Sequence, residues 1–529
     1  MTVLKELEQM FAKGKITRRE FVSRLSALGL TVAISPTLFA RTGMAAIPKK
    51  GGVFRMGLMG GSTTDSLDPG VMNDTVPISL NWSTRNALVE VDHKGEAIPE
   101  LAETWEAAPG AKNWTFKLRK GVEFHNGKTM TAKDVLYSIN HHRGEDSKSA
   151  AKSIVAQIDD IKIDDKHTIT IMLKSGDADF PYKMSDYHLT IFPDETTQAD
   201  LEKAVGTGGY ILENHEPGVR ASLKRNPNYW KEGRAHFDEL QYILINDSIA
   251  RTNALQSGQV DVINGVELKT AHLLKKSPKI QLAEGAGSRH FPFPVRCDQA
   301  PYTDNNVRLG LKLAVDRQEM VDKILRGFGY VGNDIPIGKN QKYFAKDLPQ
   351  RQYDPEKAKF HMKKAGMLGH TFNLHTADAA FLGGVDAAVL YKEQASKAGI
   401  NIKVVREPND GYWSNVWMKK EWVASYWSGR ATVDWMFSLA YSDETNWNET
   451  AWKNDSFNKL LKKARPELDE AKRAKMYFEL QKIVHDDGGA IIPMFGSWLM
   501  AANTKVKFGT VAGDWDFDGL RATERWWFA

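Results

Sequence analysis

The chain of 529 residues is long enough for about three domains, each with a sizeable hydrophobic core. Its 42% hydrophobic and 26% charged residues exclude a collagen-like, disordered or polytopic membrane protein. The net charge of +5 does not indicate a nucleic-acid-binding surface, because residues 1–45 carry seven basic and three acidic side chains and the remainder carries 64 against 63.

The first predicted element is a leader over residues 1–46. A basic segment is followed by a modestly apolar run over 25–40 and by small residues at 43–46, which is typical of an export signal. Residues 17–22, Thr-Arg-Arg-Glu-Phe-Val, resemble a twin-arginine signal; an amphipathic cytoplasmic helix is the alternative. Cleavage after Ala45 or Ala46 would leave no cysteine nearby for a lipid anchor. We therefore expect a soluble periplasmic protein.

Strands and helices alternate along the rest of the chain. Residues 51–57 read as a first strand, and Thr131 with Asp134 marks the start of a helix over 132–142. Alternating apolar residues predict further strands at 168–173 and 242–245. Helical periodicity follows at 306–325, 355–364, 386–398, 456–463 and 467–484. This interleaving predicts an α/β chain rather than a helical bundle.

The sequence carries none of the short motifs of catalysis. His-Glu-x-x-His, Gly-x-Ser-x-Gly and a Walker loop are all missing from it. The single cysteine, Cys297, excludes an internal disulfide and a multi-cysteine metal site, and it is expected to be a buried apolar side chain. We therefore predict no enzyme, no cofactor and no metal, and a secreted hydrolase is the alternative that turnover of any solute would support.

Several motifs occur in one order along residues 50–529. They are Leu101–Trp105, Trp114–Gly127, Thr131–Ser138, Gly206–Tyr210, Arg225–Trp230, Asn306–Arg308, Ala314–Arg317 and Tyr353–Ala358. Together they closely resemble the family 5 extracellular solute-binding proteins of ABC importers, the group of dipeptide-, oligopeptide-, nickel- and opine-binding proteins. Three residues within these motifs are expected to hold strands and helix together rather than to contact a ligand: Arg119, Phe124 and Asp134.

The resemblance implies a bilobal periplasmic-binding-protein fold of the large, three-domain α/β type, whose lobes close by a hinge over a solute. Domain I would comprise residues 47–84, 207–295 and 497–529, domain II residues 85–206, and domain III residues 296–496. It also implies delivery of the solute to a membrane permease. We expect a monomer that binds no nucleic acid.

A second dense feature is the aromatic segment from Trp413 to Trp452, which holds seven of the fifteen tryptophans. Polar residues interrupt the aromatics, as in a pocket wall, although core packing explains each aromatic equally well. Residues 288–291, Ser-Arg-His-Phe, and the loop 59–64 would supply further walls. The predicted ligand-binding residues are Trp413, Trp427, Arg430, Asp434, Trp435, Asn446, Arg289 and His290.

Arg430 marks a departure from the family pattern. In the peptide-binding members, a Trp-x-x-Asp segment in this region places an aspartate against the α-ammonium group of the ligand, whereas Trp427 is followed here by Ser-Gly-Arg. A guanidinium repels an ammonium and holds a carboxylate by paired hydrogen bonds. We therefore expect an acidic solute at Arg430, with its apolar body between Trp427 and Trp435. The alternatives are that Asp434 pairs with Arg430, or that it serves an ammonium from a shifted position.

Two other functions fit the same scaffold. A nickel or metal-chelate binder could recruit His290, His125 and Met59, although their spacing forms no cluster of ligands. A chaperone or sensor could use the cleft for unfolded segments. The leading expectation is capture of a peptide-like or opine-like solute that bears a carboxylate.

Overall fold

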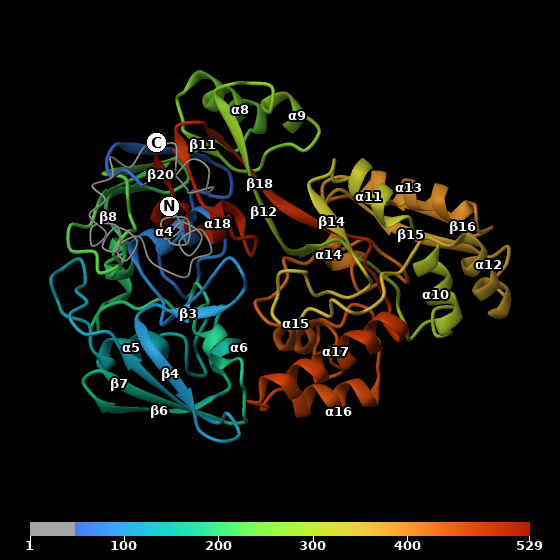
Figure 1. Ribbon diagram of the computed structural model, residues 1–529, viewed down its shortest axis with the longest axis horizontal. Coiled ribbons are helices and arrows are strands. Elements are labelled where there is room, and N and C mark those ends of the chain that lie inside the picture. Colours follow the sequence, from blue (N-terminus) through green and yellow to red (C-terminus); the bar gives the residue numbers. More distant parts are fainter. Residues whose placement is uncertain (1–47) are drawn as a thin grey trace, which may run out of the picture.

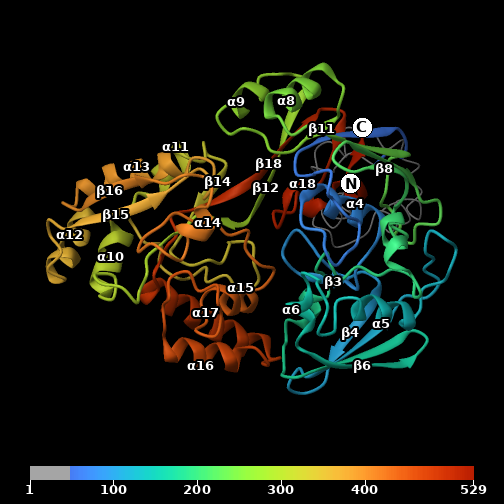
Figure 2. The same cartoon turned by 180° about the vertical axis from the view of Figure 1, so that it is seen from behind.

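The structure of the protein is a computed structural model that describes residues 48–529; the predicted leader lies outside the described residues. Figures 1 and 2 show two lobes side by side, joined where two long strands cross between them. We call the blue and green body the first lobe and the yellow and orange body the second lobe. No helix of the described residues is long and apolar enough to span a membrane.

The first lobe is built on an eight-stranded sheet. Its strands run in the order β12 (Ile280–His290), β18 (Met494–Asn503), β11 (Val262–Ile263), β1 (Val53–Leu58), β10 (Glu239–Leu244), β9 (Arg220–Arg225) and β8 (Tyr210–Glu216), and β14 (Gly329–Val331) pairs with β18. Strand β1 runs parallel to both of its neighbours, β10 and β11. The carboxyl ends of these three strands therefore meet at one edge, where open α/β sheets leave a crevice for ligands.

A second, antiparallel sheet completes the lower part of the first lobe (Figure 1). Its order is β4 (Ala102–Ala107), β5 (Asn113–Leu118), β7 (Thr168–Leu173) and β6 (Ile158–Asp165), beside the hairpin β2 (Val89–Val91) and β3 (Ala97–Pro99). The other elements of this lobe are α4 (Thr75–Thr84), α5 (Ala132–Asn140), α6 (Lys152–Val155), α7 (Phe180–Lys183), the 3₁₀ helix Gln198–Lys203, α8 (Ser248–Ser257), α9 (Ala271–Leu274), β19 (Val506–Lys507), α18 (Asp516–Leu520), α19 (Ala522–Arg525) and β20 (Trp527–Phe528).

The second lobe is mainly helical. A parallel pair, β15 (Thr371–Thr376) and β16 (Asn401–Arg406), and a short pair, β13 (Phe293–Pro294) and β17 (Ala490–Ile491), lie among its helices. The helices are α10 (Asn305–Leu313), α11 (Arg317–Lys323), α12 (Pro355–Lys364), α13 (Gly384–Ser396), α14 (Tyr412–Asn415), α15 (Val433–Ala440), α16 (Asp455–Ala464) and α17 (Glu470–Asp487). Two hydrophobic clusters, both drawn from residues 291–495, form its core. The exact domain boundaries within the chain stay a prediction.

Most of the predicted elements are confirmed, one predicted helix differs, and several elements were not predicted, among them α4. Helix α5 begins with the expected capping box of Thr131 and Asp134. The helix expected over 306–325 is two helices, because Asp316 accepts a hydrogen bond from the backbone N–H of Glu319 and starts α11 anew. Helix α4 was not predicted: nearly every residue of it is buried, so its sequence has no polar face from which a helical period could be recognised.

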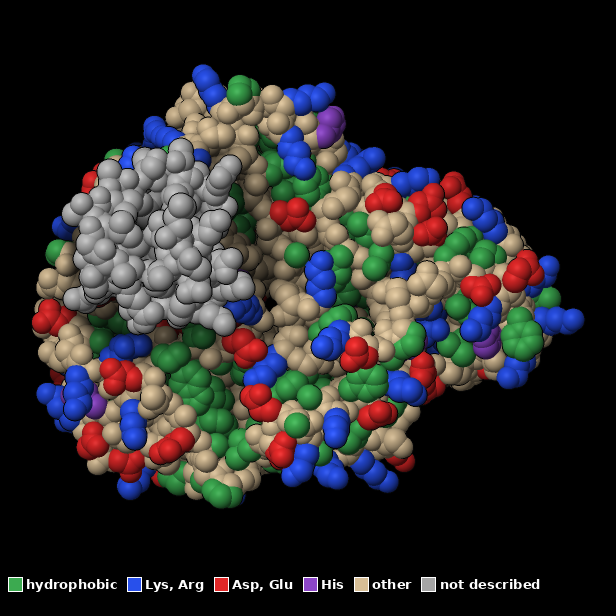
Figure 3. All heavy atoms as spheres, in the orientation of Figure 1, with side chains coloured by type: hydrophobic (Ala, Val, Ile, Leu, Met, Phe, Trp, Pro, Cys, Tyr) green, Lys and Arg blue, Asp and Glu red, His purple; other side chains and the backbone are tan. Residues whose placement is uncertain are grey.

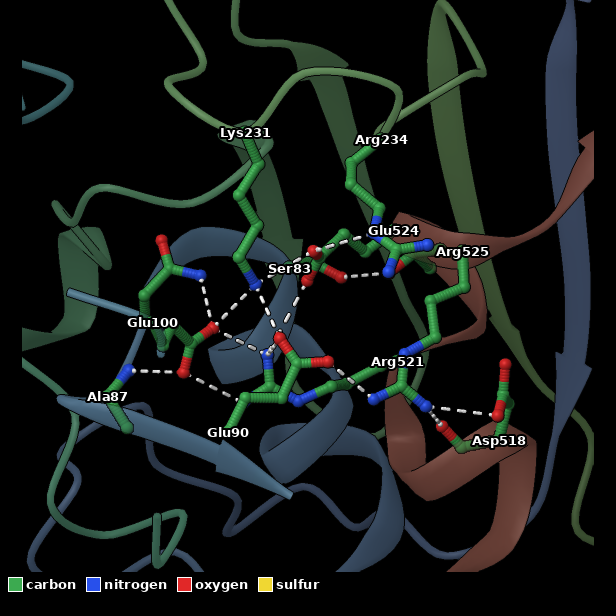
Figure 4. Close-up of polar contacts among 12 residues, drawn as sticks. Ser83, Ala87, Glu90, Glu100, Lys231, Arg234, Asp518, Arg521, Glu524 and Arg525 are labelled. Atoms are coloured by element: carbon green, nitrogen blue, oxygen red, sulfur yellow. Dashed lines mark hydrogen bonds and ion pairs between the residues drawn. The ribbon is translucent and has the colours of Figure 1, made fainter. Parts of the chain in front are cut away.

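Charged side chains buried in the first lobe tie the C-terminal segment to the sheet hairpin (Figure 4). Arg521 donates from both terminal nitrogens to Glu100, at 2.7 and 3.1 Å, and Lys231 contacts Glu90, Glu100 and Glu524 at 2.7–3.0 Å. Because every member has an opposite charge in contact, burial of the group is compensated. The network thereby fixes the last helices, and the turn before them, in the first lobe.

The predicted scaffold role of the family motifs agrees with their contacts. Arg119 donates to the backbone carbonyl of Glu100 at 2.6 Å, and Phe124 is buried in the core of the small sheet. The Asp134 carboxylate is fully buried, caps α5 and accepts from the backbone N–H of Asp194. The contacts of these three side chains are therefore structural.

Candidate functional site

The two lobes touch along their facing edges. Asp179 in the first lobe and Arg473 in the second form an ion pair at 2.7 Å in which both side chains are nearly inaccessible to solvent. The backbone N–H of Ala178 donates to the carbonyl of Arg465 at 2.8 Å, close to this pair. Figure 3 shows a hollow between the lobes. The candidate site is this hollow, at the crossing of β12 and β18.

Arg289 lies at the end of β12, where the chain enters the second lobe. Its guanidinium stacks 4.2 Å from the ring centre of Trp498 and donates to the carbonyl of Ser497 at 2.9 Å. Its Nε is buried without a hydrogen-bond partner among the described residues, where it forms no ion pair. Burial lowers the pKa of the Arg289 guanidinium to about 10, which leaves it charged at neutral pH. An uncompensated buried cation favours an anionic ligand.

Arg430 follows the segment that pairs with the end of β12. His290 and Trp427 exchange backbone hydrogen bonds at 2.9 and 3.0 Å, which sets Arg289 and Arg430 on adjoining extended segments. Burial lowers the pKa of the Arg430 guanidinium, and the nearby charges that oppose this shift belong to Asp186 and Tyr187 of the first lobe. Arg430 donates to the backbone carbonyl of Gly429 at 2.5 Å and has no ion pair with any described residue.

Asp434 does not pair with Arg430. It lies on α15 with a fully buried carboxylate, 3.2 Å from Arg465, and Ser438 donates to it at 3.3 Å. Burial raises the pKa of Asp434 to about 6, with the nearby Asp177 and Asp179 adding to the shift. The structure thus places Asp434 in the ion-paired contact between the lobes.

The predicted aromatic wall divides into buried and exposed members. Trp427 is 6% exposed, and its indole N–H donates to Glu449 at 2.9 Å. This ring is part of the hydrophobic core of the second lobe. Trp413 is 40% exposed and packs edge-on against Tyr426, which is 44% exposed. Tyr426 is close enough to Arg289 to affect its pKa. Trp413 and Tyr426 therefore form an exposed aromatic pair in the second lobe.

The remaining predicted residues are more dispersed. Trp435 is partly buried on α15, one residue after Asp434, and Asn446 is exposed in the loop between α15 and α16. His290 is fully buried; its Nδ1 contacts the carbonyl of Ser288, and burial lowers the pKa of its imidazole to about 4. His290 is therefore a neutral, fully buried side chain.

The loop after β1 lies at the carboxyl edge of the large sheet. Met59 is 42% exposed there, and its backbone N–H donates to Asn264 at 2.9 Å. Among residues 48–529 no three His, Cys, Asp or Glu side chains gather in an arrangement that could hold a metal ion. His125 contacts the backbone of Gly206 and Gly208.

Four residues that were not predicted from the sequence lie near Arg289 or Arg430 or pack on one another: Tyr187, Trp498, Trp515 and Asp516. Trp515 packs edge-on against Tyr187 at 5.7 Å, and Asp516 follows it with a carboxylate that is 6% exposed. Trp498 stacks on Arg289, as described above. The sequence carried no signal that groups them, because only the folded chain brings Trp515 of the C-terminal tail against Tyr187.

Comparison with known proteins identifies the family. Residues 96–449 match the family model for bacterial extracellular solute-binding proteins, family 5. The chain belongs to this family. As a family 5 protein it is a solute-binding component of transport, and its α/β fold is the periplasmic-binding-protein type that the motifs predicted.

Two relatives and one solved structure show how far the likeness extends. The chain is 24% identical to di/tripeptide-binding protein 1 of Pseudomonas aeruginosa over 76% of this chain and 81% of that one. It is 27% identical to haem-binding protein A of Haemophilus influenzae, over 76% and 79%. The structure of HbpA2 from Haemophilus parasuis superposes with a TM-score of 0.80 at 21% identity, covering 90% of this chain and all of the other.

Proposed function

We propose that this family 5 protein captures a carboxylate-bearing solute in the hollow between its lobes and delivers it to the permease of an ABC importer. The observation that carries the proposal is the pair of arginines, Arg289 and Arg430, which lie partly buried at the hollow without ion pairs among the described residues. Buried guanidinium groups without a counter-ion are costly, and a bound carboxylate compensates them by charge-assisted hydrogen bonds.

The relatives are compatible with an acidic solute. Their printed names give di- and tripeptides in one case and haem in another, and both kinds of molecule carry carboxylates. The exposed rings of Trp413 and Tyr426 offer an apolar wall for the body of the solute. The periplasmic location, export by the twin-arginine-like leader and action as a monomer are parts of the same proposal.

Matched acids and amides test the proposal. Dipeptides and opine-type N-carboxyalkyl amino acids would be titrated against the mature chain, each beside the amide in which every carboxylate is neutralised. A true ligand at about 100 times its dissociation constant stabilises the folded state by ~2.7 kcal/mol, so we expect a clear rise in melting temperature with an acid and none with its amide. If the acid and its amide raised the melting temperature equally, binding would not depend on a carboxylate held by the arginines.

A further inference from the structure

Helix α12 has a basic outer face with an exposed aromatic ring at its centre. Its two fully buried residues lie four positions apart and pack into the core of the second lobe: Ala358 and Met362. Phe360 lies on the opposite side of the helix and is 61% exposed. Residues three and four positions apart are neighbours on the surface of a helix. Lysines occupy three such positions and flank the ring on both sides; they are Lys357, Lys363 and Lys364.

The lysines of α12 are not paired with acids in the described part of the chain. All four side chains are exposed and none forms an ion pair with residues 48–529: Lys357, Lys359, Lys363 and Lys364. Elsewhere in the same lobe exposed lysines are paired, as Lys323 of α11 is with Glu319 at 2.6 Å. The one acid of α12 is Glu356, in its first turn. Since residues 46–529 carry nearly equal numbers of basic and acidic side chains, this face is a local concentration of positive charge.

Helix α12 lies at the outer end of the second lobe, away from the first lobe and from the hollow (Figures 1 and 2). Figure 3 shows apolar side chains beside Lys or Arg side chains on the convex surface at this end. Leu368, which is 43% exposed, follows the turn at Gly366 that ends the helix and adds a second apolar side chain. A convex end of the molecule can meet a flat surface without a clash from the rest of the chain.

We propose that the outer face of α12 docks on an anionic phospholipid surface, with Phe360 entering the headgroup region and the lysines contacting lipid phosphates. Interfacial helices combine the same two attractions, since the aromatic ring gains apolar burial and the basic groups are drawn to negative headgroups. Docking at this end leaves the hollow open to solvent, so the protein can take up solute while it stays at the membrane. The inference goes beyond the proposed function and holds for any solute.

Co-sedimentation of the mature chain with lipid vesicles tests the proposal. Vesicles of equal parts phosphatidylglycerol and phosphatidylcholine would be compared with vesicles of phosphatidylcholine alone. Each lysine close to an anionic surface strengthens binding by about 5-fold, so four lysines should give a preference of at least about 100-fold for the anionic vesicles. Because salt screens exposed charges, this preference should disappear at an ionic strength of about 1 M.

Variants on the helix separate the charge from the ring. Lys363→Gln combined with Lys364→Gln should weaken binding to the anionic vesicles by about 25-fold, the product of two lysines. Phe360→Ser should weaken it by about 10-fold and leave its salt dependence, since only apolar burial is lost. The control combines Lys120→Gln with Lys133→Gln, two exposed first-lobe lysines without an ion pair among the described residues, and should bind as wild type does.

Three outcomes would overturn the proposal. They are equal binding to anionic and neutral vesicles, no binding to either, and a loss in the first-lobe control as large as that in the α12 variant. Absence of vesicle binding would leave an acidic protein surface as the occupant of this face. The comparison of the two vesicle types uses wild-type protein alone, so a folding defect in a variant would not obscure it.

Discussion

Replacing Arg430 with alanine should weaken binding of the native acidic solute by about 100-fold. Truncating one partner of a buried, hydrogen-bonded charge pair costs about 2–5 kcal/mol, and each 1.4 kcal/mol is a factor of ten in the dissociation constant. Arg430 suits this role because its guanidinium is partly buried and forms no ion pair with the described residues. Isothermal titration of the acid identified by the matched series would measure the loss.

Two further variants sharpen that result. Arg430→Lys keeps the charge but loses the planar fork that binds both oxygens of a carboxylate, so its affinity should lie between wild type and Arg430→Ala. Arg296→Ala serves as the control, because Arg296 in the same lobe already has a carboxylate partner, Asp298, at 2.6 Å. Undiminished affinity in Arg430→Ala, with the same fold, would remove Arg430 from the site.

Arg473→Met should open the protein in the absence of solute. Arg473 is the partner of the buried Asp179 across the lobes, at 2.7 Å, and losing one member of such a pair costs about 3–5 kcal/mol. That cost falls on the closed form, since Asp179 regains water when the lobes separate. Small-angle scattering of the solute-free variant should give a larger radius of gyration than wild type. Affinity should also fall, because the binding-competent form becomes less populated.

A matched lysine on the same helix provides the control for this experiment. Lys482 forms an exposed pair with Asp486 on α17, at 3.2 Å, and exposed pairs contribute about 0–1 kcal/mol. Lys482→Met should leave both the scattering and the affinity unchanged. If Arg473→Met lowered the melting temperature while the radius of gyration stayed at the wild-type value, the pair would stabilise the fold and have no part in closure.

The sequence predicted the fold better than the site. Capping residues and apolar periodicity are local, so α5, α12 and β7 agree with expectation. Helix α4 was missed because burial on all sides removes its periodicity. Arg430 could be singled out because it departs from a family motif, whereas the ion pair of Asp179 with Arg473 could not, since it forms only where the two lobes meet.

The aromatic segment shows a second limit of the sequence. Composition indicated a pocket wall but could not tell which rings face solvent. Trp427 satisfies its indole N–H on a buried carboxylate, Glu449, while Trp413 and Tyr426 remain exposed. Likewise, the sequence left open whether Asp434 pairs with Arg430 or binds an ammonium group. In the structure Asp434 pairs with Arg465, at the end of α16. Such choices between partners depend on tertiary contacts that no local pattern encodes.

Native mass spectrometry of the mature chain, purified gently from cells grown in rich medium, tests the central claim most directly. A tightly held solute survives such purification, and its mass and fragmentation identify its ionisable groups. We expect a co-purifying molecule that bears a carboxylate and is absent from Arg430→Ala prepared in the same way. A co-purifying molecule without any acidic group, or one retained equally by Arg430→Ala, would contradict the account of an arginine-anchored acidic solute.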